Sequence, residues 1–263
     1  MAAVEGGHDA IRPQRSPSQG RSRTGTVLRY AGMPAGLLLA SLVLYVWLSG
    51  KPLDSIEHQV LSADAIRAAV VQHLKLVVYS TVTIAALAVP LGVLLTRPFA
   101  NWATPPVLAL ANIGQTVPSL GVLVVLALLW SVGFESALIA LMLYAFLPVL
   151  RNTMVGLEQV DPAIKEAARG QGMTKFAVLV KIELPLAVPV ILAGIRTALV
   201  INVGTATIAV LTNAGGLGAI VYSGIIHARV TVLIAGSVMT ALLAMAVDYV
   251  AGVIEEWLSP RGL

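Results

Sequence analysis

The sequence contains no cysteine, so neither disulfides nor thiolate metal sites are available to it. Charged residues are scarce, at 11% of 263 residues, whereas hydrophobic residues make up 57% and the mean hydropathy is +0.87. A soluble core cannot absorb that many apolar side chains, so the composition excludes an ordinary soluble domain and indicates an integral membrane protein. Aromatic residues, at 5%, are too few and too dispersed for a cage of rings around a quaternary ammonium ion.

Several chemical signatures are also missing. The chain has no GxxxxGK[ST] phosphate loop, so we expect it not to hydrolyse ATP itself, and it has no HExxH pattern. The histidines fall in segments expected to be tails or loops, and several methionines have no metal-ligand spacing. These residues are His8, His58, His73 and His227, and Met33, Met142, Met154 and Met173. We therefore expect no catalytic residue, no metal site and no cofactor bound by this chain.

Basic residues lie at the ends of apolar runs and do not gather on a polar domain, which argues against a nucleic-acid partner. Residues 1–29 are polar and hold five arginines, and this composition predicts a disordered cytoplasmic tail. Residues 30–50 carry no charge and are long enough to cross about 30 Å of hydrocarbon. They lack a small-residue cleavage site, so we interpret them as a retained transmembrane anchor. Residues 51–71 are mixed in polarity and predict an external loop.

The remaining apolar runs predict five more spans. After Arg97 there are 37 residues without a charge, about 55 Å of helix, which is too long for one span and must be broken. The predicted spans are 76–96, 105–130 with an irregularity near Pro118, 136–150, 188–211 and 230–254, followed by a cytoplasmic tail at 257–263. With both termini inside, 12 of the 17 basic residues are cytoplasmic and four external, with Arg196 in a span. This asymmetry favours that orientation.

The segment 158–185 is the only long polar interruption after the first loop, so we expect it to meet another protein. Asp161 can cap a helix that begins at Pro162, and Thr174 can cap a second short helix. Gly172 separates the two, and Pro185 ends the second helix or marks entry into the next span. The pattern predicts two short helices that meet at a glycine bend on the cytoplasmic side.

These residues resemble a known signature. Glu166-Ala167-Ala168, then Gly172, then Ile182, Leu184 and Pro185 are similar, at the same spacing, to the EAA motif of permease subunits of binding-protein-dependent ABC importers. The resemblance implies a coupling loop that docks on a cytoplasmic ATPase, with Glu166 as a polar contact, Ala167 and Ala168 allowing close packing, and Gly172 providing the bend. The alternative is a surface hairpin without a partner.

The resemblance extends over residues 72–256. Segments 112–120, 143–153, 194–198, 204–207 and 213–218 resemble the osmoprotectant branch, which imports glycine betaine, carnitine, choline or proline. It implies an all-α membrane protein with a five-helix type I core, to which this chain adds an N-terminal span. The implied partners are ATPase subunits that bind ATP and Mg, a second permease subunit, an external substrate-binding protein and membrane lipid, and the implied location is the bacterial inner membrane. A permease for amino acids such as methionine, or a secondary transporter, is the alternative function.

Polar residues inside the predicted spans are candidates for the translocation path, because lipid cannot satisfy their hydrogen-bonding groups. They are Asn112, Gln115, Thr116, Pro118, Ser119, Asn202 and Thr205. Hydrogen bonding between packed helices is the alternative role. Arg196 is expected to pair with Glu183 or a helix end and not to contact substrate. The glycines at 215, 216 and 218 are interpreted either as an outer gate or as a turn.

Overall fold

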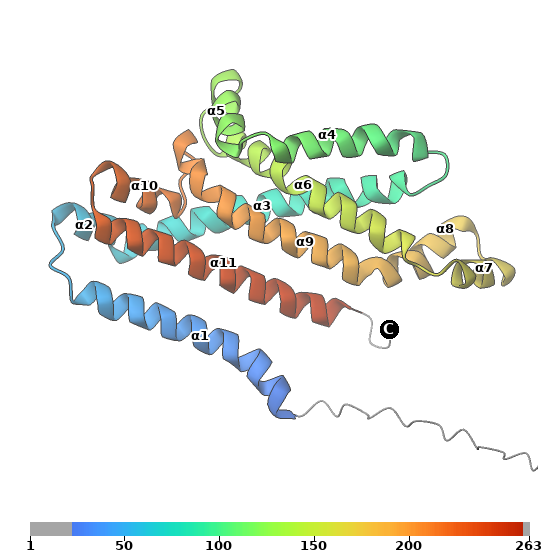
Figure 1. Cartoon of the computed structure of the whole chain (residues 1–263), viewed down its shortest axis with the longest axis horizontal. Helices are drawn as coiled ribbons and strands as arrows, with labels where there is room; N and C mark the ends of the chain where they lie inside the picture. Colours follow the sequence, from blue (N-terminus) through green and yellow to red (C-terminus); the bar gives the residue numbers. More distant parts are fainter. Residues whose placement is uncertain (1–22, 260–263) are drawn as a thin grey trace, which may run out of the picture.

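The computed structural model describes residues 23–259, and the regular structure in that range is helical throughout (Figure 1). The longer helices are α1 (Arg23–Ser49), α3 (Ala63–Leu95), α4 (Thr104–Thr116), α5 (Ser119–Leu129), α6 (Phe134–Glu158), α9 (Leu184–Ala206) and α11 (Val230–Leu258). Shorter ones are α2 (Ser55–Val60), α7 (Pro162–Gly170), α8 (Lys175–Val178), α10 (Gly218–Ile226), the π-helical turn Leu179–Glu183, and 3₁₀ turns at Asn101–Ala103 and Thr207–Thr212. Residues 1–22, which belong to the predicted tail at 1–29, and residues 260–263 lie outside the described residues.

Five helices of the described part are long and apolar enough to cross a membrane, and a sixth crossing is possible if a bent pair counts as one span. The bent pair consists of 101–116 and α5, whose axes differ by 95°. The break lies at Val117 and Pro118, where Val117 is extended and Pro118 has no amide hydrogen to continue a helix. The irregularity predicted near Pro118 is therefore confirmed, although it is sharper than a kink in a continuous span.

The centre of the bundle is formed by α6 with α3 and α9 on either side, and the α6–α9 and α3–α6 contacts are the most extensive between helices of the described part. Glycines allow their backbones to approach closely. A Cβ atom at Gly92 would lie 2.8 Å from Thr153, one at Gly156 would lie 3.1 Å from the Ala187 carbonyl oxygen, and one at Gly194 would lie 2.6 Å from the Asn152 Cβ. These three helices consequently form a tightly packed block.

Different elements lie toward the two ends of the bundle. In Figure 1 the start of α1, the end of α11 and the α7–α8 pair lie toward one end, whereas α2, α5 and α10 lie toward the other. The first helix packs along α11, at the side of the bundle.

Three predicted boundaries differ from the structure. The external loop predicted at 51–71 contains α2 and the first turns of α3, because Asp54 and Glu57 form a capping box and Ser62 caps α3. Helix α1 begins at Arg23, so residues 23–29, assigned to the tail, are helical. At the other end α11 continues to Leu258, past the predicted start of the tail at 257.

Candidate coupling hairpin and intramembrane polar sites

The local geometry of the segment 158–185 follows its sequence closely. The Asp161 carboxylate accepts a hydrogen bond from the Ala163 amide at 2.8 Å, and Pro162 occupies the first turn of α7. The Thr174 hydroxyl accepts from the Ala177 amide at 3.2 Å and so caps α8. Gly172 has a φ of +86°, a conformation that favours glycine. Two short helices meet at a glycine bend, as predicted, and we call residues 161–178 the hairpin.

The hairpin presents both polar and apolar side chains to its surroundings. Glu166 and Ala167 are exposed, whereas Ala168 is buried. Phe176 is 74% exposed and Ile164 is 44% exposed, although both are apolar. Exposed large apolar residues on a short, charged element are typical of a surface that another protein covers. Phe176 was not identified as a site residue from the sequence, because it lies outside the EAA-like pattern.

The second half of the hairpin is continuous with a membrane-crossing helix. α8 passes through the π-helical turn directly into α9, so Pro185 marks entry into the span and lies in the first turn of α9. Ile182, Leu184 and Pro185 are half-buried at this junction. A force applied to α8 would therefore act along the axis of α9.

The candidate path residues on α4 and α5 lie around the 95° break. The Asn112 side chain donates to the Leu108 carbonyl oxygen at 2.8 Å and accepts from Arg151 at 3.2 Å, while Gln115 donates to the Tyr144 carbonyl oxygen on α6 at 3.0 Å. Thr116 and Pro118 are exposed, and Ser119 is half-buried at the start of α5. The structure thus brings these five residues together on one side of α6.

The candidates on α9 lie elsewhere. Asn202 is fully buried and donates to the Ser80 and Thr81 hydroxyls of α3 at 2.9 and 3.0 Å. These contacts fit the alternative role of Asn202 as a link between packed helices. Thr205 is half-buried on the same helix, one position before the end of α9.

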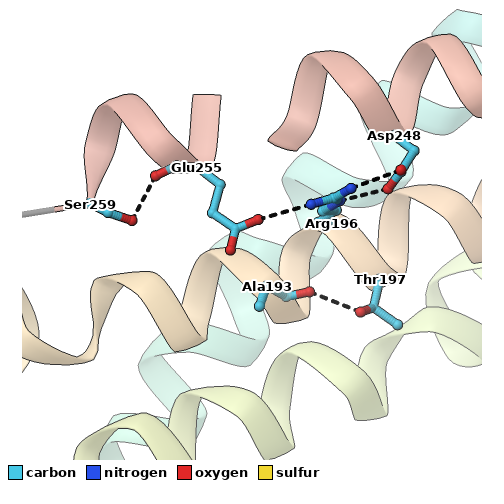
Figure 2. Close-up of polar contacts among 6 residues, drawn as sticks. All are labelled: Ala193, Arg196, Thr197, Asp248, Glu255 and Ser259. Atoms are coloured by element: carbon cyan, nitrogen blue, oxygen red, sulfur yellow. Dashed lines mark hydrogen bonds and ion pairs between the residues drawn. The ribbon is translucent and has the colours of Figure 1, made fainter. Parts of the chain in front are cut away.

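Arg196 pairs with α11, as Figure 2 shows, and not with Glu183 as expected. Its Nε and Nη2 atoms donate to the two Asp248 carboxylate oxygens at 2.6 and 2.8 Å, and Nη1 lies 3.4 Å from Glu255. Gly252 leaves room for the guanidinium, because a Cβ atom there would lie 3.0 Å from Nη1. A cavity of about 230 Å³ adjoins this cluster and is also lined by Met33 of α1. Arg196 therefore has a structural role, as expected, but its partners are Asp248 and Glu255.

His73 is fully buried in α3 and does not lie in a loop as predicted. Its Nδ1 accepts from the Leu217 amide at 3.3 Å, and its Nε2 lies 3.0 Å from the Val203 carbonyl oxygen. The neighbouring Gln72 accepts from the Gly216 amide at 3.1 Å. Gly215 and Gly216 have positive φ angles of +77° and +88°. These contacts hold the glycine-rich turn before α10 against α3 and α9.

The described residues contain no group of three or more His, Cys, Asp or Glu side chains placed to hold a metal ion. Membrane-crossing helices around a packed block, with an exposed helical hairpin at one end, define a multi-pass membrane protein. The chain belongs to the family described as "Binding-protein-dependent transport system inner membrane component", whose model matches residues 88–261.

Several curated relatives are similar over most of this chain. The carnitine transport permease protein OpuCD of Listeria monocytogenes is 41% identical over 192 residues, which cover 72% of this chain and 84% of the relative. The glycine betaine/carnitine/choline transport system permease protein OpuCD of Bacillus subtilis is 41% identical over 192 residues, covering 72% and 82%. The osmoprotectant import permease protein OsmW of Salmonella typhimurium is 37% identical over 216 residues, covering 80% and 100%.

A solved structure supports the fold. An inward-facing structure of the MetNI methionine ABC transporter contains a chain that superposes with a TM-score of 0.65, covering 74% of this chain and 96% of that chain at 24% identity. At this identity the likeness concerns the fold alone. It confirms the predicted membrane domain of the ABC importer type.

Proposed function

We propose that this chain is the permease subunit of an ABC importer that carries osmoprotectants such as glycine betaine, carnitine or choline across the inner membrane. A separate ATPase subunit binds ATP and Mg and supplies the energy. An external binding protein delivers the solute, and a second permease subunit, identical or different, completes the path. Osmoprotectant transport is favoured over methionine because the relatives at 37–41% identity are named for osmoprotectants, whereas the methionine transporter is similar only in fold.

The single observation that carries the energy coupling is the exposed hairpin. Its exposed side chains include Glu166 and the apolar residues Ile164 and Phe176, and its second helix is continuous with α9. An ATPase that binds this hairpin and closes on ATP would pull on α9 directly. Phe176 is 74% exposed on a short, charged element outside the membrane-crossing helices, which supports a protein partner that covers it.

The same geometry supports the proposed orientation. The hairpin, the start of α1 and the end of α11 lie toward one end of the bundle (Figure 1). If the hairpin meets a cytoplasmic ATPase, then both termini are cytoplasmic, as the distribution of basic residues favours. In this orientation α2, α5 and α10 face the external binding protein.

The candidate path lies at the α4–α5 break. The polar groups of Asn112, Gln115, Thr116 and Ser119, beside Pro118, supply hydrogen-bonding groups at a point where the helix is interrupted. Interrupted helices whose polar groups line a cavity are a recurrent way to place a solute path inside a membrane. Thr205 lies apart from this set on α9, and the buried contacts of Asn202 make Asn202 the weakest candidate.

The test is uptake of radiolabelled glycine betaine, carnitine, choline and methionine by vesicles that contain the permease, the ATPase and the binding protein. We expect uptake of the osmoprotectants, dependent on ATP, and none of methionine. Glu166→Lys and Gly172→Asp should reduce both uptake and ATPase association. Asp64→Lys, which makes the same charge change at the far end of α3, should leave ATPase association unchanged.

A secondary transporter is separated by the same vesicles. If uptake continues without ATP and follows an ion gradient, the importer proposal is wrong. Labelling of Lys165 and Lys175 gives an independent check, since both should be reachable only from the cytoplasmic side.

A further inference from the structure

The EAA-like pattern leaves one position open, between Ile182 and Leu184, and the structure places a buried carboxylate there. Glu183 is 4% exposed, and its Oε2 accepts from Nη2 of Arg97 at 2.7 Å. Arg97 lies just beyond the end of α3, 86 residues earlier in the chain. The ion pair therefore joins the end of α3 to the root of the hairpin.

Arg97 is itself held by its own helix. Its Nε donates to the Val93 carbonyl oxygen at 3.2 Å, and Nη2 also donates to the Thr96 hydroxyl at 3.0 Å. A cation that binds the last carbonyls of a helix also interacts favourably with the helix dipole. The guanidinium is thus bonded to the end of α3 and to Glu183 at the same time. Its position is therefore fixed, unlike that of a mobile surface charge.

Glu183 is the last residue of the π-helical turn that joins α8 to α9. In such a turn the hydrogen bonds span five residues, the helix is wider, and bends concentrate there. Besides Pro189 inside α9, this turn is therefore one place where the rod made of α8 and α9 can bend. A contact from another helix at this position opposes that bend.

We propose that the Arg97–Glu183 pair is a positioning strut that stiffens the π-helical turn, so that displacement of the hairpin reaches α9 and α3 together. This inference rests on the proposed function, because it assumes that a partner moves the hairpin. Arg97 and Glu183 act through the helices that they join and touch no substrate.

The fold at this junction does not depend on the ion pair alone. Leu157, Ala187 and Ile191 form a buried apolar cluster with side chains from α3, the π-helical turn and α9 packed against it. Gly156 brings α6 against Ala187 in the same region. Since replacing both partners of a buried ion pair by apolar residues is often neutral for stability, the double variant should still fold.

The experiment measures solute imported per ATP hydrolysed by the complete complex of permease, ATPase and binding protein in proteoliposomes. The key variant is Arg97→Met combined with Glu183→Leu, which removes both charges and leaves no buried carboxylate unpaired. We expect this double variant to assemble with the ATPase but to import about tenfold less solute per ATP, a loss typical of a broken coupling between sites. Arg97→Lys keeps the charge but lacks the Nε bond to the Val93 carbonyl oxygen, so its import per ATP should lie between the values of the parental complex and the double variant.

Lys181→Met is the matched control, since it removes one positive charge from an exposed position of the same π-helical turn. Its import per ATP should equal that of the parental complex. The single variant Arg97→Met leaves Glu183 buried and unpaired, so it should assemble less well than the double variant.

Two results would overturn the strut. One is a parental import ratio in the double variant, and the other is its failure to assemble, which would make the pair purely structural. If the parental complex itself neither binds the ATPase nor imports an osmoprotectant, the proposed function fails and the strut with it. If the parental complex imports an osmoprotectant and the double variant imports as much solute per ATP, the strut proposal is wrong and the proposed function stands.

Discussion

The cluster of Arg196, Asp248 and Glu255 makes a quantitative prediction about stability. Arg196 makes two close bonds to Asp248, at 2.6 and 2.8 Å, but only one long contact to Glu255, at 3.4 Å. Hydrogen bonds to charged groups contribute about 1.5–3 kcal/mol when well formed, and a contact of 3.4 Å contributes much less. The two side chains of the Asp248 pair are 38% and 34% exposed, so solvent screening reduces this contribution.

We therefore expect Asp248→Ala to lower the free energy of unfolding by about 1.5–2 kcal/mol and Glu255→Ala by no more than about 0.5 kcal/mol. For a protein of this size about 1 kcal/mol corresponds to roughly 2–4 °C in Tm, so Asp248→Ala should melt about 3–8 °C lower. The assay is thermal unfolding of the purified permease in lipid nanodiscs, followed by intrinsic fluorescence at a fixed heating rate.

A double-mutant cycle with Arg196→Ala tests the reasoning. If the Asp248 pair carries the effect, Arg196→Ala and Asp248→Ala together should cost less than the sum of the two single variants by about 1 kcal/mol or more. If the losses in the free energy of unfolding of the two single variants are additive, the bidentate pair is not the source of the stability. It would also be refuted if Glu255→Ala melts as low as Asp248→Ala.

Two further predictions concern other parts of the bundle. Gly218→Ala should prevent recovery of folded permease in size-exclusion profiles, because the new Cβ would overlap the Thr207 carbonyl oxygen and lie 2.7 Å from its carbon, whereas Gly121→Ala, with nothing within 4 Å, should behave as the parent. The pKa of Asp54 is lowered, first by the hydrogen bond from the Glu57 amide and further by Arg229, so its contribution to stability is present above the usual carboxyl pKa and is lost as pH falls through the lowered value. The protection factors of the amides of residues 54–60, which correct for the intrinsic pH dependence of exchange, should therefore fall in acid, and in Asp54→Asn they should no longer fall.

The hairpin was predictable from the sequence because its signals are local. The capping roles of Asp161 and Thr174 and the bend at Gly172 depend on residues within a few positions, and all three are present. The overall helical architecture was also predictable, since the length and polarity of apolar runs decide whether a helix can cross a membrane.

Partners distant in sequence were not predictable in the same way. Arg196 was expected to pair with Glu183 or a helix end, yet Glu183 meets Arg97, and Arg196 meets Asp248. These pairings depend on how α3, α9 and α11 pack. His73 was assigned to a loop because Lys75 was taken as the boundary of the span. In the structure α3 begins at Ala63, twelve residues before Lys75, and the imidazole of His73 is buried.

The first helix illustrates a different limit. Its length and lack of charge identified it as a span, but nothing in the sequence indicated that it would lie along α11. The relative OsmW is matched along its full length by 80% of this chain, so a fifth of this chain has no counterpart there.

The glycine contacts among α3, α6 and α9 also restrict where a solute can go. With backbones this close at Gly92, Gly156 and Gly194, rotating side chains cannot open a solute-sized gap between these helices. A passage has to form on their outward faces, beside α4, α5 or α10, or against a neighbouring chain. The tight block is then one wall of the conduit and not its lumen.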